Sequence, residues 1–180
     1  CHHARILAAN PRCQLVGVAD VSEEAARQNA QACRTQAFSD YRELLDKVDA
    51  VSIAVPTVAH HQVATDFMRA GVHVLVEKPI ASTVDQAREM IELAHEKDLT
   101  LQVGHIERFS AAIRKLREML TAPRFVECLR QGPFNPRIQD VGVVLDLMIH
   151  DLDIVLEIVR SPVEHIEAVG IPVLTEKEDI

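Results

Sequence analysis

The sequence predicts an α/β fold in which a doubly wound parallel sheet is followed by part of an α+β domain. Short apolar runs alternate with helix-like segments between residues 14 and 105, which is the pattern of βαβ units and of a parallel sheet. The run at 50–56 is apolar on both faces, as a central parallel strand requires. After residue 105 this alternation ends, and two long helical segments are mixed with two half-apolar strand patterns.

The first part contains four expected strands, at 14–21, 50–56, 73–79 and 99–105, and five expected helices, at 2–10, 22–33, 40–45, 61–71 and 83–98. Ser22 and the acidic residues after it are helix-start signals. Gly71 is a natural end for the helix at 61–71. The apolar positions of the helix at 83–98 recur at three- and four-residue steps and predict its buried face: Val84, Ala87, Ile91 and Ala94.

The second part contains expected helices at 107–120 and 142–159 and expected strands at 124–132 and 163–173. We therefore expect two domains. Residues 1–105 form the layer with the parallel sheet, and residues 106–180 begin an α+β layer.

The composition argues against several partners. The formal net charge is −8, with one Tyr and no Trp, so no nucleic-acid partner is expected. No apolar run approaches the roughly 20 residues of a membrane-spanning helix, so no membrane partner is expected. The four cysteines form no C-x-x-C pair, which favours reduced thiols that fill apolar space in a cytoplasmic protein.

The ends of the strands hold the first candidate residues, because ligands bind beyond the carboxyl ends of parallel strands. Asp20 ends the strand at 14–21. An acid at this position binds the ribose hydroxyls of a dinucleotide and repels a 2′-phosphate, which favours NAD over NADP. A strand-terminal Asp is also a common helix cap, but Ser22 already provides the cap here.

The stretch "VPTVAHH" follows the central strand. Pro56 ends the strand, and Thr57 offers a hydroxyl that binds a cofactor or caps the next helix; both interpretations stay open. His60 lies at the start of that helix. We do not expect the pair His60 and His61 to bind a metal, because adjacent residues on a helix point in different directions.

The strand "HVLVEKP" ends on a carboxylate, an ammonium and a proline. Lys78 closing a buried strand predicts an amine that takes part in proton transfer. Pro79 keeps Lys78 out of helical geometry, and Glu77 neutralises or orients the amine. The alternative is an ion pair on a surface loop.

Asp146 and His150 are four residues apart and therefore share one face of an otherwise apolar helix. A carboxylate beside an imidazole orients the ring and raises its basicity, as a general base requires. The alternative for His150 is a hydrogen-bonded core histidine. Asp151 and Asp153 are expected to be solvated or to cap the helix. A zinc site lacks a third ligand at suitable spacing, so no metal is expected.

In these motifs the chain resembles the Gfo/Idh/MocA oxidoreductases, through "VPTVAHH", "AGVHVLVEKPIA", "LTLQVGHIERF" and the later D-x-x-x-H. The resemblance implies an NAD(P)-binding Rossmann domain followed by an α/β domain that binds substrate and builds dimers or tetramers. It also implies that the first strand and the glycine-rich loop precede this chain, and that most of the second sheet follows it. "GHIERFSAA" carries Ser110 and Ala111 where relatives often have Asn-Pro.

The resemblance implies roles at matching positions. The catalytic residues are Lys78, Asp146 and His150, with His150 as the acid or base. The cofactor-binding residues are Asp20, Pro56, Thr57, His60, Glu77, Lys78 and Pro79.

The function that we expect is hydride transfer between NAD and a hydroxyl carbon of a sugar, inositol or nucleotide sugar. A non-catalytic dinucleotide-binding sensor or scaffold is the alternative, because a fold does not guarantee activity. A metal-dependent lyase or hydrolase is a third, smaller possibility. Arg108 is expected to be exposed on a helix face.

Overall fold

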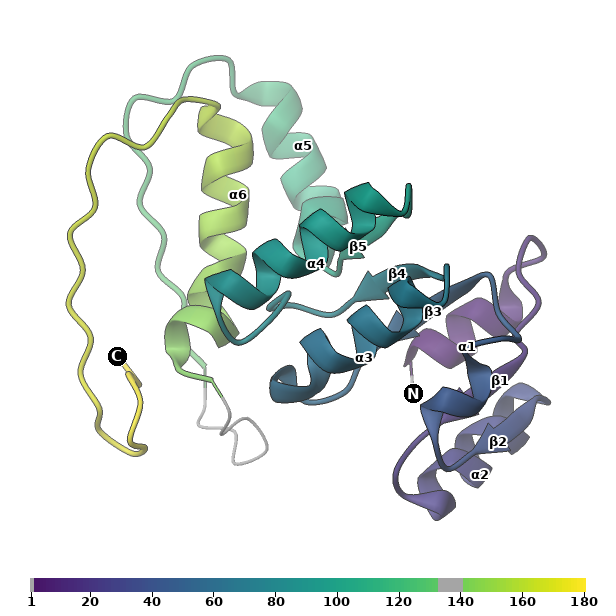
Figure 1. Ribbon diagram of the computed structural model, residues 1–180. Coiled ribbons are helices and arrows are strands. Elements are labelled where there is room, and N and C mark those ends of the chain that lie inside the picture. Colours follow the sequence, from purple (N-terminus) through teal and green to yellow (C-terminus); the bar gives the residue numbers. More distant parts are fainter. Residues whose placement is uncertain (1, 133–140) are drawn as a thin grey trace.

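The computed structural model describes residues 2–132 and 141–180 and contains two parallel sheets flanked by helices (Figure 1). Strands β3 (Ala50–Ile53), β4 (His73–Val76) and β5 (Leu101–Val103) form one sheet in the order β3-β4-β5. Strands β1 (Gly17–Ala19) and β2 (Gln36–Phe38) form the other. Every pairing is parallel, so the predicted α/β fold is confirmed.

The helices between the strands make the crossovers that parallel strands require. The element order begins with α1 (His2–Ala9), which precedes β1, and α2 (Glu23–Cys33), which leads from β1 to β2. A 3₁₀ turn, η1 (Tyr41–Leu44), comes before β3. Helices α3 (Thr57–Arg69) and α4 (Val84–Glu96) connect β3 to β4 and β4 to β5. Strand β2 was not predicted, because its residues do not form an apolar run.

The helix boundaries follow the capping residues. Ser22 accepts a hydrogen bond from the backbone N–H of Ala25, as predicted. Thr83 accepts one from Gln86 in the same way and starts α4. Helix α3 begins four residues earlier than expected, directly after Pro56. It ends before Gly71, whose φ of 85° lies in the left-handed region that favours glycine.

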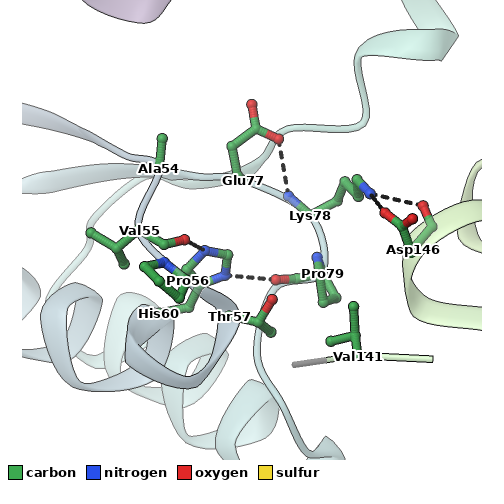
Figure 2. Close-up of a pocket in the computed structure, with 10 residues that line it drawn as sticks. All are labelled: Ala54, Val55, Pro56, Thr57, His60, Glu77, Lys78, Pro79, Val141 and Asp146. Carbon is green, nitrogen blue, oxygen red and sulfur yellow. Dashed lines mark hydrogen bonds and ion pairs between the residues drawn. The ribbon is translucent and has the colours of Figure 1, made fainter. Parts of the chain in front are cut away.

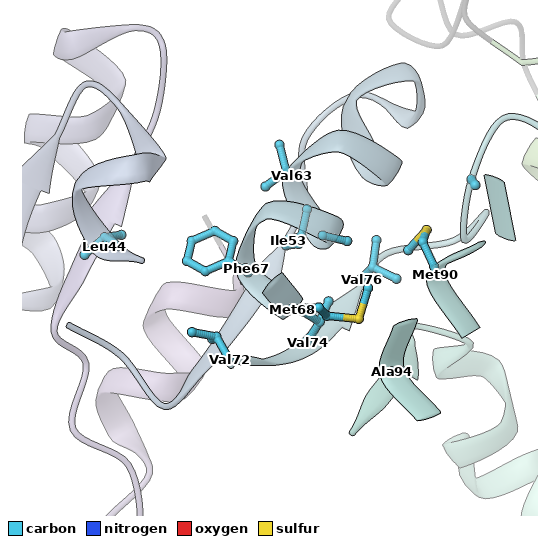
Figure 3. Packing of buried hydrophobic residues seen from close by; sticks show 12 residues of the cluster. Leu44, Ile53, Val63, Phe67, Met68, Val72, Val74, Val76, Met90 and Ala94 are labelled. Carbon is cyan, nitrogen blue, oxygen red and sulfur yellow. The ribbon is translucent and has the colours of Figure 1, made fainter. Parts of the chain in front are cut away.

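The hydrophobic core lies between the three-stranded sheet and helices α3 and α4 (Figure 3). Phe67 and Met68 of α3 and Val76 of β4 are at most 1 % exposed. The predicted buried face of α4 is partly wrong. Ala94 is buried, but Val84 is 65 % exposed and Ile91 is 45 % exposed.

The residue that fills the core from α4 is Met90, which is fully buried. Met90 was not among the predicted positions, and its flexible thioether fits an irregular gap. The buried face of α4 is therefore rotated from the predicted one and centres on Met90. Ala87 and Leu93 pack against the core as partly buried residues.

The second part consists of helices without a sheet among the described residues. The expected helix at 107–120 is divided into η2 (Ile106–Phe109), a 3₁₀ turn, and α5 (Ala111–Met119). Ser110 separates them and caps α5 by accepting a hydrogen bond from Ile113. The expected helix at 142–159 begins with a π-helical segment, η3 (Val144–Met148), and continues as α6 (Ile149–Val159).

The expected strands at 124–132 and 163–173 are wrong for this structure, because neither segment is a strand. Their apolar residues are exposed instead: Phe125 by 83 %, Leu129 by 82 % and Val169 by 90 %. An alternating sequence becomes a strand only when a neighbouring strand completes its hydrogen bonds, and the described residues offer none here.

Two smaller points concern partners and thiols. Among the described residues no helix is long and apolar enough to cross a membrane. Cys13, Cys33 and Cys128 are free thiols. Cys13 and Cys128 are exposed, so these two are not the apolar fillers that we expected.

Candidate active site

A pocket of about 240 Å³ opens at the carboxyl ends of β3 and β4 (Figure 2). This is the edge of a parallel sheet where ligands bind. The loop after β3, the first turn of α3, the loop after β4 and the segment before α6 supply its lining: Ala54, Val55, Pro56, Thr57, His60, Glu77, Lys78, Pro79, Val141 and Asp146. The structure therefore brings six of the seven expected cofactor residues together with Asp146.

Lys78 joins the two parts of the molecule across this pocket. Its ammonium donates hydrogen bonds to the Asp146 backbone carbonyl at 2.8 Å and to the Asp146 Oδ1 at 2.9 Å. Both side chains are about one-fifth exposed, at 20 % and 22 %. An ammonium has three N–H donors, and these contacts use two. Because both side chains are largely shielded from solvent, this ion pair is not one on an open surface loop.

Glu77 is oriented by neighbours on both sides. Its Oε2 accepts a hydrogen bond from the Lys78 backbone N–H at 3.2 Å. Its Oε1 lies 2.8 Å from the Nε2 of His3, whose Nδ1 lies 2.6 Å from the Oγ of Ser52. A Cβ on Gly104 would lie 2.9 Å from the Glu77 Oε2, so a glycine at this position leaves room for the carboxylate.

No sequence pattern pointed to His3 or Ser52. The His in "HHARIL" was assigned only to a helix, and a serine inside a strand carries no signal of its own. The contact between α1, β3 and the end of β4 arises from tertiary packing, and no local sequence pattern predicts it.

Asp146 does not hold His150 in the way that we predicted, because its carboxylate binds Lys78 instead. The four-residue spacing assumed an α-helix, but Asp146 lies in the π-helical segment η3, which has more residues per turn. Among the described residues the Nδ1 of His150 is buried without a hydrogen-bond partner. No carboxylate one turn away holds this Nδ1.

The electrostatic surroundings of His150 favour the neutral ring. Burial lowers the pKa of His150 below its ordinary value of 6.5, and the charges of Lys78 and Arg130 lower it further. His150 is not among the residues that line the pocket, so its convergence with Lys78 on one reacting oxygen stays a prediction. The neutral imidazole is the form that accepts a proton.

Thr57 and His60 lie on the first turn of α3 and line the pocket. Pro56 is the residue at the N-cap of the helix, so Thr57 does not occupy the capping position that we considered for it. His60 is 1 % exposed, and its two ring nitrogens face backbone carbonyls rather than the open pocket. His61 points elsewhere, to Glu89, as expected for adjacent residues.

Asp20 is the one expected cofactor residue outside this pocket, because it follows β1 in the other sheet. It is exposed, and its Oδ1 accepts a hydrogen bond from the backbone N–H of Ser22 at 2.9 Å. Asp20 therefore takes part in the start of α2, and its role toward a cofactor stays a prediction.

Three other expectations about charged residues are wrong. Asp153 is not solvated: it is buried and holds the guanidinium of Arg108 through both carboxylate oxygens, with the Arg108 Nε at 2.6 Å. Arg108 is therefore not a free helix-face residue. Asp151 binds Arg130 through two hydrogen bonds of 2.9 Å. Sequence spacing cannot find these pairs, since their partners are 45 and 21 residues apart.

A metal site is not assembled in the part of the chain that the structure describes. No group of three or more His, Cys, Asp or Glu side chains there is arranged to hold an ion. The chemistry available is proton transfer and hydrogen bonding by an ammonium, an imidazole and two carboxylates.

Parallel strands with crossover helices, and an amine at the carboxyl edge of the sheet, define a dinucleotide-binding α/β protein. The comparison with protein families is consistent with this class. Residues 1–105 match the family model of the Gfo/Idh/MocA oxidoreductases, described as an oxidoreductase family with an NAD-binding Rossmann fold. The chain belongs to this family.

Individual relatives agree with the family. UDP-N-acetylglucosamine 3-dehydrogenase from Acidithiobacillus ferrooxidans is 44 % identical over 168 residues, covering 93 % of this chain and 54 % of the relative. A solved structure of that enzyme superposes with a TM-score of 0.90 at 43 % identity, over 99 % of this chain and 58 % of the other. Myo-inositol 2-dehydrogenase from Thermotoga maritima is 28 % identical over 176 residues, or 91 % of this chain and 52 % of the relative.

A 3-ketoreductase from Actinomadura kijaniata, solved with NADP and TDP-benzene, has a TM-score of 0.61 at 27 % identity. The match covers 64 % of this chain and 36 % of the chain of the ketoreductase. The chain spans about half the length of the curated relatives that it matches first.

Proposed function

We propose that this chain is the catalytic part of an NAD(P)-dependent dehydrogenase that acts on a hydroxyl carbon of a nucleotide sugar. The observation that carries the proposal is the position of Lys78 at the carboxyl edge of the sheet, with its ammonium held by Asp146 from the second part of the chain. The relative at 44 % identity, named for its action on UDP-N-acetylglucosamine, supports this substrate class over inositols or free sugars.

The pocket fits part of a dinucleotide. Its volume of about 240 Å³ is below the roughly 300–1,000 Å³ of a complete small-molecule site, which suits one ring and its neighbours. Pro56 offers an apolar wall, and the Glu77 carboxylate offers polar atoms in the lining. When bound, the nicotinamide supplies the acceptor or donor of the hydride.

Lys78 and His150 divide the proton chemistry between them. Lys78 directs its remaining N–H toward the reacting oxygen and stabilises the negative charge that develops there. His150 accepts the hydroxyl proton in its neutral form, which its lowered pKa favours. Asp146 keeps the ammonium in place. Acid–base catalysis of this kind contributes roughly 10²–10⁴-fold in rate, and positioning supplies most of the rest.

The cofactor preference is part of the proposal. Asp20 is exposed at the end of β1, and a carboxylate there repels a 2′-phosphate, so we propose NAD over NADP. We also propose that residues 106–180 begin a domain that binds the sugar and joins subunits into a dimer or tetramer. The exposed apolar residues of that part support an interface.

The test uses a full-length protein that contains this chain. Replacing His150→Asn is expected to reduce kcat with NAD and UDP-N-acetylglucosamine by 10²-fold or more, at the scale of lost acid–base catalysis, and to leave NADH affinity within about threefold. NADH fluorescence measures binding, and NADH absorbance measures turnover. Unchanged turnover in this variant would refute the role of His150.

The same measurements separate an enzyme from a sensor or scaffold. A module that only binds the dinucleotide would show NADH binding and no turnover with any nucleotide sugar. The ammonium that Asp146 holds beside the pocket argues against the module, because binding alone does not need a fixed amine at a reacting oxygen.

A further inference from the structure

The buried imidazole of His60 connects the two loops that form the pocket. His60 is 1 % exposed. Its Nδ1 lies 2.8 Å from the carbonyl oxygen of Pro79, and its Nε2 lies 2.9 Å from the carbonyl oxygen of Val55 (Figure 2). Val55 belongs to the loop after β3, and Pro79 belongs to the loop after β4.

Both partners of His60 are carbonyl acceptors, so each contact is a hydrogen bond only where the facing ring nitrogen carries a proton. A neutral imidazole donates one of the two hydrogen bonds, and the doubly protonated ring donates both. In either form no ring nitrogen is left for a ligand. His60 therefore acts on the protein backbone, although it lines the pocket.

The two loops carry the residues that the reaction uses. Val55 precedes Pro56, which walls the pocket, and Pro79 follows Lys78 directly. The ammonium of Lys78 is held at its far end by Asp146. A second attachment at Pro79 fixes the backbone from which the Lys78 side chain starts, so the amine is held at both ends.

We propose that His60 is a positioning residue that holds the Pro56 loop and the Lys78 loop at a fixed separation, so that cofactor and amine meet. The consequence for turnover rests on the proposed dehydrogenase function. The two contacts of His60 with the loops, which we call the clamp, belong to the structure and can be measured without turnover.

The neighbouring residue provides a matched control. His61 is on the same helix and bonds through its Nε2 to the Glu89 carboxylate at 2.8 Å. This contact joins α3 to α4 on the exposed side and touches neither loop. His60→Phe and His61→Phe therefore remove the same chemical groups from the same helix, and only the first releases the loops.

The first experiment measures hydrogen–deuterium exchange in a full-length protein that contains this chain. In His60→Phe, peptides covering 54–58 and 77–82 are expected to exchange about tenfold faster, because the closed state loses its cross-connection. His60→Gln keeps one N–H donor and is expected to lie between that variant and the wild type. His61→Phe is expected to match the wild type in both peptides. If both loop peptides of His60→Phe exchange at the same rate as in the wild type, the proposed clamp is wrong.

The second experiment measures kcat per folded enzyme with NAD and UDP-N-acetylglucosamine. A displacement of about 1 Å costs on the order of 10²-fold in rate, so we expect a 10- to 100-fold loss in His60→Phe and a partial rescue in His60→Gln. His61→Phe is expected to stay within about twofold of the wild type. A purely structural role would reduce the folded fraction and leave kcat per folded enzyme unchanged, and that result would overturn the positioning role.

The two experiments also separate this proposal from the proposed function. If the wild type turns over no nucleotide sugar, the dehydrogenase proposal fails, while the exchange data still report on the clamp. If His60→Phe does not fold, His60→Gln carries both measurements.

Discussion

Residues 2–105 and residues 106–180 differ in how they are held together. Among the described residues, nearly every buried side chain belongs to the first part, and only Asp153 and Ile154 belong to the second. The first part covers a sheet with helices, so its apolar residues have partners. In the second part α5 has no buried residue, and the strand-like segments expose their apolar side chains.

The comparison shows that a correct sequence pattern produces an element only where a partner exists. The alternation at 163–173 is as clear as the apolar run at 50–56, yet only the second became a strand. Helices satisfy their own backbone hydrogen bonds, which is why α5 and α6 formed in the second part although a sheet did not. Polar contacts replace the missing core there, with Arg108 bound to the buried Asp153.

The largest expected effect contrasts two phenylalanines in this 180-residue chain. Phe67 is 1 % exposed and packs on Tyr41 with ring centroids 5.9 Å apart, so Phe67→Ala is expected to lower the free energy of unfolding by about 3–5 kcal/mol. Phe125 is 83 % exposed, so Phe125→Ala is expected to change it by less than about 0.5 kcal/mol. Urea unfolding measures both. A loss above about 2 kcal/mol for Phe125→Ala in a longer protein would instead mean that 124–132 joins a sheet there.

The next effect tests the ion pair that holds the second part. Asp153→Asn leaves the Arg108 guanidinium without its carboxylate. The cost is expected at about 1–2 kcal/mol, below the value for a fully buried pair, because Arg108 is 42 % exposed. The control is Asp151→Asn, whose carboxylate is 18 % exposed against 7 % for Asp153, with an expected cost below about 1 kcal/mol. Equal costs in urea unfolding would contradict the special position of Asp153.

A smaller effect compares two helix caps. Thr83→Ala removes the cap of α4, which packs on the core, and is expected to cost about 1 kcal/mol in global unfolding. Ser110→Ala removes the cap of α5, which has no buried residue, so the helix is expected to fray locally. Its global cost should stay below about 0.5 kcal/mol, while amide exchange in 111–119 increases. The reverse order of costs would show that α5 carries more of the stability than its burial indicates.

The smallest effect concerns pH. Since the folded pKa of His150 is below 6.5, the unfolded chain binds more protons than the folded chain between these two values. Stability is therefore expected to fall as pH decreases through this window, and less so in His150→Asn. Urea unfolding at several pH values measures the difference between the two slopes. In the enzyme, kcat/KM for oxidation should fall on the acid side with a midpoint below 6.5. A midpoint above 6.5 would contradict the lowered pKa.

The sequence by itself determined the parallel α/β layer, the cap at Ser22, and the gathering of Pro56, Thr57, Glu77 and Lys78 at one edge of the sheet. These features depend on local period, local hydrogen bonds and the rule that parallel strands end together. Only the tertiary structure decided that Asp146 binds Lys78 instead of His150, that His60 faces two carbonyls, and that Asp153 is buried against Arg108. Each of these contacts depends on where a distant backbone segment lies, and the spacing of residues along the chain carries no record of that.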